Sequence, residues 1–380
     1  MKKKIMIVFG TRPEAIKMAP LVHALRAEPD FFEVMVCITA QHREMLDQVL
    51  ETFEIAPDID LNIMKPGQDL FDISTNVQLG MRDVFAEHRP DIAIVQGDTT
   101  SALSAAIAGF YSGVPIGHVE AGLRTHDLFA PFPEEFNRQV ISKVARWHFA
   151  PTKISQENLL AERIPQEAIT VTGNTAIDSL QWVLKRIDSD VSRSIVLNDK
   201  ISAVLPFNWS KQRFVLITGH RRENFGDGFM QICNAIHDLA LRYPEVHFVY
   251  PVHLNPNVRQ PTKKILKEVF NLHLIEPLDY ELFVYLLKHC HSVLTDSGGI
   301  QEEAPSLGKP VLVMRDTTER PEAVNAGTAK MVGANKERIV SGVARLLEDE
   351  VHYQSMSKAH NPYGDGHSCA RIVNVLKKKV

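Results

Sequence analysis

Three acidic residues in the first half of the chain stand where carboxylates could move protons to and from a substrate. Asp98 and Glu120 each come shortly after an apolar run, and Glu134 follows the proline-rich turn Pro-Phe-Pro. Carboxylates that cluster raise one another's pKa, which suits general acid and base catalysis near neutral pH. The structural alternatives are a helix N-cap for Asp98 and, for Glu134 and its neighbour Glu135, surface positions that complement a helix dipole. Three acids at successive element ends favour catalysis over these alternatives.

Two basic residues follow the apolar run 5–9, in the segment Gly-Thr-Arg-Pro-Glu-Ala-Ile-Lys. Thr11 and Glu14 form a capping-box pattern, which predicts that a helix begins here. Arg12 and Lys17 then lie near a helix N-terminus, which favours anions, so the segment predicts a phosphate or pyrophosphate site. The alternative is two solvated surface cations. The segment matches neither G-x-G-x-x-G nor G-x-x-x-x-G-K-[ST], which argues against a bound dinucleotide and against a Walker-type kinase.

The second half of the chain places similar residues after its own apolar runs. Gly-His-Arg-Arg follows the run 214–218, so His220 is a candidate phosphate partner or proton donor, with a structural histidine as the alternative. Thr-Asp-Ser-Gly-Gly follows the run 293–295, and its small residues would expose backbone N–H groups to a pyrophosphate. The alternative for this segment is a flexible strand-to-helix turn. The small residues are Ser297, Gly298 and Gly299.

Three charged residues extend this second candidate site. Glu303 lies one turn beyond the glycines and could accept hydrogen bonds from ribose hydroxyls. Arg315 and Arg320 follow the next apolar run and add positive charge there. The glycine turn, together with Arg12, Lys17 and His220, predicts a cleft for a nucleoside diphosphate.

Short apolar runs alternate with amphipathic helical patterns along the chain, and these runs are the predicted strands. They span residues 5–9, 34–39, 92–95, 115–119, 148–150, 169–172, 214–218, 246–250, 273–275, 293–295, 311–314 and 330–332. Uninterrupted apolar strands joined by helices indicate parallel sheets covered on both faces. Residues 188–212 lose this rhythm and are predicted to join two domains. The predicted fold class is therefore α/β, with two doubly wound Rossmann-like domains. Because ligands bind at the carboxyl ends of such strands, we expect the two domains to face each other across a cleft.

The composition excludes several classes of protein. The chain has 380 residues, enough for two or three domains, and its 42 Lys and Arg against 46 Asp and Glu give a net charge of -4. No excess of positive charge favours nucleic acid or an anionic membrane as a partner. The four cysteines are scattered without C-x-x-C or zinc spacing, which indicates reduced thiols in a cytoplasmic protein. The uncharged stretch 99–119 contains Ser, Thr, Gly and Pro, so it is predicted to be a buried helix and strand and not a membrane span.

Long motifs extend over nearly the whole chain. They include F-G-T-R-P-E-A-I-K-M-A-P, A-Q-H-R-E-M-L-D-Q-V-L, G-D-T-T, G-H-V-E-A-G-L-R-T, P-E-E-x-N-R, G-H-R-R-E-N, Y-P-V-H-L-N-P-N-V, L-T-D-S-G-G-I-Q-E-E-A-P-S-L-G-K-P and N-P-Y-G-D-G. From Phe9 to Gly366, the sequence resembles the bacterial non-hydrolysing UDP-N-acetylglucosamine 2-epimerases. One departure is Gln96, at a position where many members of that family have His.

The resemblance implies a GT-B-like fold and reversible C2 epimerisation of UDP-GlcNAc to UDP-ManNAc, which supplies ManNAc units for bacterial surface polysaccharide. It implies a cytoplasmic homodimer that needs no metal or cofactor and is activated by UDP-GlcNAc at a neighbouring site. The expected domains are residues 1–173, with the catalytic acids, and residues 174–366, which bind UDP. The C-terminal helix, 367–380, is expected to pack back on the N-terminal domain.

The resemblance also assigns roles to individual residues. Asp98, Glu120 and Glu134 match the catalytic acids of the family, and His220 matches the partner of the leaving group. The substrate-contact positions are Arg12, Lys17, Arg138, Leu278, Phe283, Ser297, Gly298, Gly299, Glu303 and Arg320. Among these, Phe283 and the backbone of Leu278 match the uracil pocket. Gln41 and His253 match positions of the activator site.

The chemistry of the reaction explains why such residues suit it. The C2–H bond of the sugar is not adjacent to a carbonyl group, so simple deprotonation there is prohibitive. Oxidation of C3 by a nicotinamide cofactor would acidify C2, but the sequence carries no dinucleotide fingerprint after its first strand. The remaining route eliminates UDP to a glycal and adds it back, which needs carboxylates on both faces of the sugar and a stabilised pyrophosphate. The alternatives are a GT-B glycosyltransferase that uses a UDP-sugar and a nucleotide-sugar sensor without turnover.

Overall fold

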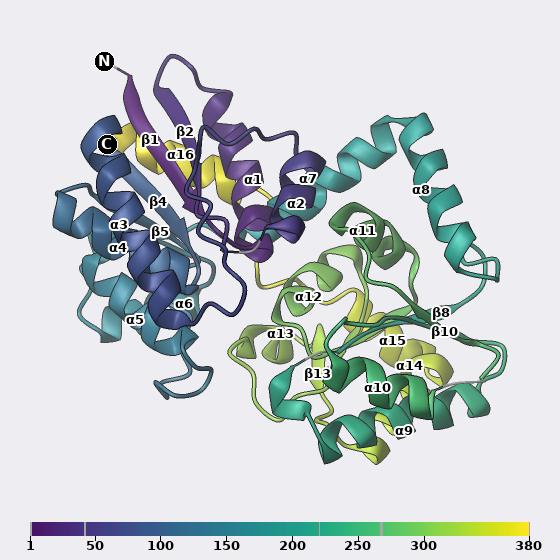
Figure 1. The fold of residues 1–380 in the computed structure, drawn as a ribbon. Helices are drawn as coiled ribbons and strands as arrows, with labels where there is room; N and C mark the ends of the chain where they lie inside the picture. The colour runs from purple at the N-terminus through teal and green to yellow at the C-terminus, as the bar shows by residue number, and fades with distance from the viewer. Residues whose placement is uncertain (1, 42, 220, 267–268, 380) are drawn as a thin grey trace. The chain divides into compact units, whose positions relative to one another are not determined.

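The computed structural model describes residues 2–41, 43–219, 221–266 and 269–379. The chain divides into two compact units, unit 1 (Met1–Trp182 and Tyr363–Val380) and unit 2 (Val183–Pro362). Each unit contains a parallel sheet with helices between successive strands, as Figure 1 shows. The α/β fold class predicted from the sequence is therefore confirmed. The expected domain limits at residues 173 and 366 stay a prediction.

Unit 1 has alternating strands and helices. Its strands are β1 (Lys3–Phe9), β2 (Phe32–Ile38), β3 (Ile59–Asp60), β4 (Ile92–Gln96), β5 (Ile116–Val119), β6 (Trp147–Ala150) and β7 (Ile169–Val171). Its helices are α1 (Arg12–Arg26), α2 (Glu44–Thr52), α3 (Leu70–His88), α4 (Thr100–Ser112), α5 (Glu134–Val144), α6 (Lys153–Ala161), the first half of α7 (Thr175–Ser189) and α16 (Ser368–Lys379). The uncharged stretch 99–119 forms α4 and β5, as predicted.

The sheet of unit 1 has the order β3-β2-β1-β4-β5-β6-β7, and all neighbouring strands pair in parallel. From β1 the chain builds outward through β2 and β3, and then returns to place β4 on the other side of β1. The loops after β1 and β4 therefore diverge at a topological switch point, where doubly wound sheets bind ligands. Arg12 follows β1 and Asp98 follows β4, so two of the predicted site residues lie in the segments that leave this switch point.

Helices cover both faces of the unit 1 sheet. α3, α4 and α5 pack side by side and enclose an apolar core together with β1 and β4. α1 packs against α2 and α16, and Figure 1 shows α16 in yellow beside the purple α1. The carboxylate of Asp178 on α7 accepts hydrogen bonds from the N–H groups of Ser368, at 3.2 Å, and Cys369, at 2.8 Å. This bond pair fixes the start of α16 in unit 1.

Unit 2 repeats the architecture with a shorter sheet. Its strands are β8 (Phe214–Thr218), β9 (His247–Pro251), β10 (Leu272–Ile275), β11 (Ser292–Thr295), β12 (Val311–Val313) and β13 (Ala329–Met331). Its helices are α8 (Val191–Val204), α9 (Asp227–Arg242), α10 (Pro256–Ile265), α11 (Tyr280–His289), α12 (Gly298–Glu303), α13 (Pro321–Asn325), α14 (Lys336–Glu348) and α15 (Glu350–Ser357). The order β10-β9-β8-β11-β12-β13, again parallel, places the switch point of unit 2 between β8 and β11.

The chain between the two sheets contains a helix that the sequence did not indicate. Residues 188–212, predicted to join two domains, are mostly helical, because α8 occupies most of this stretch. Asp190 caps α8 by accepting hydrogen bonds from the N–H groups of Ser192 and Arg193. Leu197 and Ile201 are the buried residues of this helix, and two apolar positions give a periodicity too weak to reveal it.

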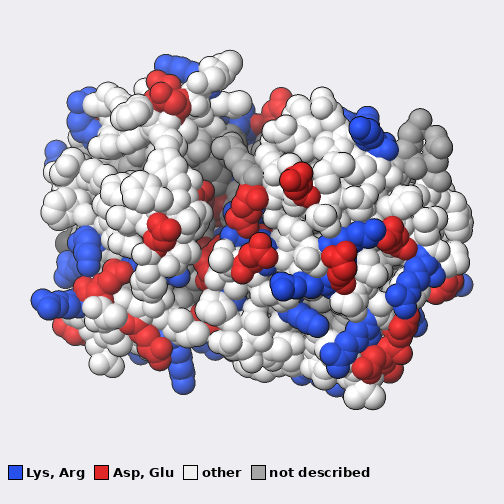
Figure 2. Space-filling view, turned by 90° about the horizontal axis from the view of Figure 1, so that it is seen from below, with Lys and Arg blue, Asp and Glu red and all other residues white. Residues whose placement is uncertain are grey.

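The surface and the cysteines agree with the composition. Lys and Arg lie among Asp and Glu over the face drawn in Figure 2, with wide areas of uncharged residues between them. All four cysteines are buried and form no disulfide, as predicted. Within the described ranges, no helix combines the length and the apolar character needed to cross a membrane.

Candidate active site

The turn from β1 into α1 is held by the side chain of Glu14. Its Oε2 atom accepts hydrogen bonds from the N–H and the hydroxyl of Thr11, both at 2.8 Å, and from the N–H of Gly10 at 3.0 Å. The predicted capping box is therefore present. Its Oε1 atom accepts from the hydroxyl of Thr99, in the turn after β4, at 2.6 Å. Burial raises the pKa of Glu14, although these donors act in the opposite direction. Glu14 thus links the two loops of the switch point.

The basic residues of α1 lie next to an acid. Arg12 begins the helix and is half-buried. Lys17 is buried, and its Nζ forms an ion pair with the carboxylate of Glu120. The sequence predicts a phosphate near Lys17, whereas the structure also places a carboxylate against it. A buried ion pair leaves an uncompensated charge when one partner is lost, so each of these charges depends on the other.

Glu120 follows β5 in an unusual backbone conformation. Its φ is 65°, a left-handed value that costs a non-glycine residue roughly 1–2 kcal/mol. Its Oε2 atom accepts a hydrogen bond from Asn174 Nδ2 at 3.2 Å, in addition to the ion pair with Lys17. Backbone strain of this kind is concentrated at functional sites, where the surrounding structure holds it. The strain at Glu120 therefore supports its predicted role as a catalytic acid.

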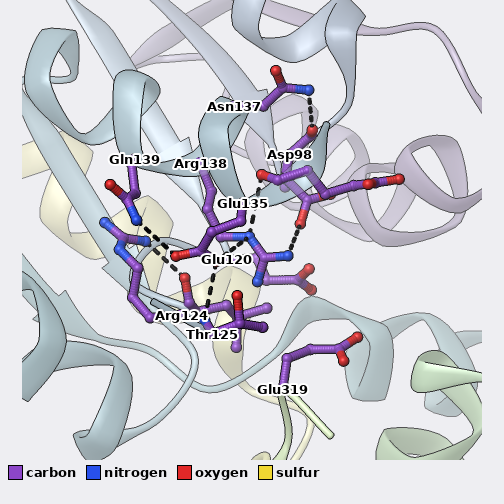
Figure 3. A network of polar contacts seen from close by, with 12 residues as sticks. Asp98, Glu120, Arg124, Thr125, Glu135, Asn137, Arg138, Gln139 and Glu319 are labelled. Carbon is purple, nitrogen blue, oxygen red and sulfur yellow. Dashed lines mark hydrogen bonds and ion pairs between the residues drawn. The ribbon is translucent and has the colours of Figure 1, made fainter. Parts of the chain in front are cut away.

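Asp98 follows β4, the strand next to β5, so Asp98 and Glu120 leave adjacent strands of the sheet. The carboxylate of Asp98 pairs with Arg138 NH2 at 3.3 Å, and 26% of the Asp98 side chain is exposed. Figure 3 shows the guanidinium of Arg138, which comes from α5, between Asp98 and Glu135. The NH1 atom of Arg138 is buried and has no hydrogen-bond partner among the described residues. Arg138 can therefore offer a donor to a ligand beside Asp98.

The structure distinguishes the two neighbouring glutamates at the start of α5. Glu135 is buried and accepts hydrogen bonds from the N–H groups of Thr125, at 3.0 Å, and His126, at 3.2 Å. Gln139 donates to it as well, at 2.8 Å. Burial raises the pKa of Glu135, but these donors outweigh it and hold the pKa below its ordinary value. Glu134 differs, because its buried Oε2 atom finds no hydrogen-bond partner within the described part of the chain. Glu135 is structural, and Glu134 keeps an oxygen for a ligand.

The predicted acids of unit 1 therefore share one end of the sheet. A Cβ atom placed on Gly97 would lie 3.9 Å from Glu120 Oε1, which shows how closely the turn before Asp98 approaches that carboxylate. Glu134 begins the helix whose Arg138 contacts Asp98. In the described ranges, no group of three or more His, Cys, Asp or Glu residues is arranged to hold a metal ion. Acids beside cations in such a site can take up and deliver protons.

The switch point of unit 2 is organised by an aspartate. Asp296 follows β11, and its Oδ2 atom accepts a hydrogen bond from the N–H of Arg221 at 2.9 Å. The Nδ2 atom of Asn224 donates to the same oxygen at 3.3 Å. The turns after β8 and β11 are thereby tied together. His220 lies outside the described residues, so its catalytic role stays a prediction.

The predicted pyrophosphate turn begins the short helix α12. Ser297 is the N-cap of this helix, and Gly298 and Gly299 are its first residues. A Cβ atom on Gly298 would come within 2.6 Å of the guanidinium of Arg320. Any side chain at residue 298 would therefore displace Arg320, which explains why a glycine stands there.

The two arginines near this turn are held by carboxylates. Arg320 donates from Nε to Glu302 at 2.6 Å and from NH1 to Glu319 at 2.5 Å. Arg315 donates to Glu223 at 2.6 Å and to Glu319 at 2.9 Å. Burial raises the pKa of Glu319, but Arg320 and then Arg315 outweigh it and hold the pKa well below its ordinary value. Both guanidinium groups are thus fixed in place before any ligand arrives.

The residues expected to hold the nucleoside lie around the start of α11. The carboxylate of Glu303 accepts a hydrogen bond at 3.0 Å from the hydroxyl of Tyr280, the first residue of this helix. Phe283 is half-buried on the same helix, and Leu278 is half-buried just before it. The expected uracil and ribose positions therefore occur together in unit 2.

The two residues expected at the activator site lie in different units. Gln41 follows β2 in unit 1, and its Oε1 atom accepts from the hydroxyl of Ser101, in the first turn of α4, at 2.8 Å. His253 follows β9 in unit 2 and is exposed, with its Nδ1 atom accepting from the N–H of Asn255 at 3.1 Å. Their role in activation stays a prediction.

Three polar residues that contact the site were not identified from the sequence. His118 Nε2 lies 2.7 Å from the carbonyl oxygen of Gly97, Asn137 donates to the carbonyl of Asp98 at 2.8 Å, and Asn174 contacts Glu120. For two of them the available signal was a polar side chain within a partly buried element, close in the sequence to a predicted site residue. His118 interrupts an otherwise apolar strand two residues before Glu120, and Asn137 stands next to Arg138.

Comparisons with known proteins give a consistent result. Residues 23–377 match the family model described as UDP-N-acetylglucosamine 2-epimerase. The chain is 57% identical over 374 residues to the UDP-N-acetylglucosamine 2-epimerase of Escherichia coli strain K12, which covers 98% of each protein. The crystal structure of UDP-GlcNAc 2-epimerase from Neisseria meningitidis bound to UDP-GlcNAc has a TM-score of 0.93 at 50% identity, covering 99% of this chain and 100% of that one. The Methanocaldococcus jannaschii UDP-GlcNAc 2-epimerase in complex with UDP-GlcNAc and UDP has a TM-score of 0.84 at 31% identity, covering 99% of each chain.

Proposed function

The chain belongs to the UDP-N-acetylglucosamine 2-epimerase family, and on that premise we propose that it interconverts UDP-GlcNAc and UDP-ManNAc by inverting C2 of the sugar. The observation that carries the proposal is the group of acids in unit 1. Asp98 and Glu120 are paired with cations, and Glu134 has a buried oxygen without a partner among the described residues. The membership in this family favours the epimerase over the glycosyltransferase alternative.

The reaction proceeds by elimination and re-addition. A carboxylate removes the C2 proton as the C1–O bond to UDP breaks, so a C1=C2 double bond forms and UDP leaves with the bonding electrons. UDP then adds back to C1, and a carboxyl group delivers a proton to C2 from the opposite face. The elimination needs a group that accepts a proton from C2, and the re-addition needs a group on the opposite face that donates one. Asp98, Glu120 and Glu134 share these two roles.

The cations of unit 1 fit this chemistry. Lys17 pairs with Glu120 and Arg138 pairs with Asp98, so a cation lies beside each of these two proposed proton-transfer groups. Glu134 offers the sugar its Oε2 atom and Arg138 offers its NH1 atom, and neither atom has a hydrogen-bond partner among the described residues. Such preorganised groups act on the reacting atoms without reorganisation of solvent.

Unit 2 provides the groups that hold UDP. The glycine turn at Gly298 and the guanidinium of Arg320 bind the pyrophosphate and stabilise its charge as the C1–O bond breaks. Phe283 and Leu278 bind the uracil, and Glu303 binds the ribose. His220 is assigned to the departing phosphate.

Incubation with UDP-GlcNAc alone in D2O, followed by NMR of C2, tests the proposal. We expect deuterium at C2 in both epimers and the appearance of UDP-ManNAc without any acceptor or cofactor. Transfer of the sugar only after an acceptor is added would instead identify a glycosyltransferase. Binding without exchange or transfer would identify a nucleotide-sugar sensor.

We also propose a cytoplasmic homodimer. α3 and α4 pack against one another, and both expose large apolar side chains, including Phe71, at 83%, and Tyr111, at 78%. Exposed apolar groups of this size mark interaction surfaces, and a second copy of the chain would cover them. Light scattering should give the mass of two chains, and Phe71→Glu should shift it toward one. Cell fractionation should recover the protein with cytoplasmic markers.

Activation by UDP-GlcNAc is the remaining part of the proposal. The contact of Gln41 with Ser101 ties this residue to the first turn of α4, directly after the Asp98 turn. Initial rates should therefore rise sigmoidally with UDP-GlcNAc, and Gln41→Ala should reduce the sigmoidality. Hyperbolic rates in the unmodified protein would contradict this part alone.

A further inference from the structure

The backbone before Asp98 is held by His118. The Nε2 atom of His118 lies 2.7 Å from the carbonyl oxygen of Gly97. Because a carbonyl oxygen only accepts hydrogen bonds, Nε2 carries the proton and donates it. His118 is fully buried, and its Nδ1 atom has no hydrogen-bond partner in the part of the chain that the structure describes. Burial lowers the pKa of His118 to about 3, so the ring stays neutral and keeps this arrangement near neutral pH.

The backbone after Asp98 is held by Asn137. This residue lies on α5 and is buried, and its Nδ2 atom donates to the carbonyl oxygen of Asp98 at 2.8 Å. Figure 3 shows this bond beside the contact of Arg138 with the Asp98 carboxylate. Two successive residues of α5 thus hold the carbonyl and the carboxylate of the same aspartate.

The next residue is held from a third direction. The hydroxyl of Thr99 donates to Glu14 Oε1 at 2.6 Å and accepts from the N–H of Ala102 at 3.0 Å. Glu14 is buried and fixed by the turn after β1. The turn from residue 97 to residue 99 is therefore anchored to three other elements, α1, β5 and α5.

These anchors determine where the Asp98 side chain points. The carbonyl of Gly97 belongs to the rigid peptide plane before the Asp98 Cα atom, and the carbonyl of Asp98 belongs to the plane after it. Holding both planes fixes φ and ψ of Asp98, and with them the direction of its Cα–Cβ bond. We propose that His118, Asn137 and Glu14 are positioning residues that aim the Asp98 carboxylate at the reacting carbon. This inference rests on the proposed function, because it assigns the residues to the proton transfer at C2.

The kinetic consequence separates positioning from a general structural role. A small displacement of a catalytic group lowers the rate of the chemical step, whereas the nucleotide-binding residues of unit 2 are untouched. A loss of stability alone lowers the fraction of folded protein, and it therefore reduces turnover and UDP binding capacity together. The turnover number should therefore fall, whereas KM for UDP-GlcNAc and the affinity for UDP should stay nearly unchanged.

Two variants of His118 form the central test. In His118→Gln, the amide Nε2 stands where the imidazole Nε2 stood and can still donate to Gly97. His118→Met has a similar length but no donor. We expect kcat to fall about 100-fold in His118→Met, with KM changed less than about 3-fold, and to recover to within about 10-fold of the unmodified value in His118→Gln. Asn137→Leu should resemble His118→Met, because it removes the donor to Asp98.

A matched control comes from unit 2. Asn271 is also a buried asparagine whose Nδ2 donates to backbone carbonyls, those of Ala240, Tyr243 and Val246. Asn271→Leu should lower the melting temperature and leave kcat of the folded protein unchanged. Equal kcat losses in Asn271→Leu and Asn137→Leu would overturn the inference, as would a His118→Met variant with normal kcat.

Amide hydrogen exchange gives a readout that does not depend on activity. In a peptide covering residues 96–103, exchange should be faster in His118→Met and Asn137→Leu and near normal in His118→Gln. Unchanged exchange in all variants would overturn the inference. If the unmodified protein produces no deuterium at C2, the proposed function fails, while this comparison still decides whether the three residues hold the turn.

Discussion

At the switch point of unit 1, buried cations hold the acids that carry the proposed chemistry, whereas at the switch point of unit 2 buried acids hold the cations. Arg138 pairs with Asp98, whose side chain is 26% exposed, and Lys17 pairs with Glu120. In unit 2, the Arg320 side chain is only 8% exposed and lies between two glutamates, Glu302 and Glu319. The same ion-pair chemistry thus positions opposite charges at the ends of two similar sheets.

This difference matches the two parts of a nucleotide sugar. A sugar carbon that loses and regains a proton needs carboxylates, whereas a departing pyrophosphate needs fixed positive charge. In each unit, the residues that hold these charged groups have the opposite charge, so the charges nearly cancel in the net charge of the protein. The net charge of -4 therefore reveals neither site.

The largest effect should come from the neighbouring glutamates of unit 1. Glu134→Gln removes a proposed proton-transfer group and should lower kcat by about 10²–10⁴-fold, without changing UDP affinity or the melting temperature. Glu135→Gln weakens the turn at Thr125 and should lower the melting temperature while keeping measurable turnover. Steady-state kinetics and thermal unfolding of both variants check this pair. Normal turnover in Glu134→Gln would refute the division of roles between them.

Breaking the buried ion pair of unit 1 should affect stability next. Lys17→Met leaves the charge of Glu120 without its cation and should lower the free energy of unfolding by about 3–5 kcal/mol. Urea unfolding followed by circular dichroism measures this loss. In Lys17→Met with Glu120→Gln, part of the stability should return, because no buried charge remains. A double variant as unstable as the sum of the two single variants would show that the pair contributes nothing.

In unit 2, the corresponding change should weaken binding of the nucleotide. Arg320→Met removes the charged hydrogen bonds that we propose to the pyrophosphate and should weaken UDP binding roughly 10–100-fold. Glu302→Gln should have a smaller effect, because Glu319 still holds the guanidinium. Isothermal titration calorimetry with UDP measures both. If Arg320→Met bound UDP normally while Glu134→Gln did not, the assignment of the two units would be reversed.

The smallest effect should be a change in how stability depends on pH. Burial lowers the pKa of His118 from 6.5 to about 3. Below pH 6.5 the His118 side chain binds a proton in the unfolded chain but not in the folded protein, so the free energy of unfolding falls as the pH drops. His118→Gln removes this contribution and should flatten the dependence above pH 4.5.

Glu319 has a lowered pKa, so its stabilising contribution is present above pH 4.5 and is lost only below it. Glu319→Gln should therefore lower the free energy of unfolding above pH 4.5 and change its slope with pH only below that value. Urea titrations over this pH range measure both slopes.

The sequence was sufficient for the fold class, whereas the roles of the site residues stay predictions. Strand ends could be placed because apolar runs are bounded by glycine and polar residues, and the parallel topology then puts the predicted residues at the switch points. The family resemblance and the epimerase assignment are confirmed by the comparisons. α8 was missed because it buries two apolar residues, Leu197 and Ile201, and depends on its neighbours for stability.

Pairings within the site could not be predicted, because they depend on contacts between distant segments. Lys17 and Glu120 are 103 residues apart, and Thr99 and Glu14 are 85 apart. Nothing in the local pattern distinguishes Glu134 from Glu135. The difference arises because the turn at Thr125 and His126 directs its N–H groups at Glu135 and leaves Glu134 an oxygen without a partner among the described residues.

The placement of α16 has a consequence for the order in which the protein matures on the ribosome. Unit 2 is one continuous stretch, 183–362, whereas unit 1 needs residues on both sides of it. During synthesis, α16 can bind the Asp178 carboxylate and pack on α1 only after all of unit 2 has been made. A nascent chain released after residue 362 would contain all of unit 2, whereas its unit 1 would lack the helix that packs on α1. Such a fragment should need a chaperone, and a separately added α16 peptide should bind it.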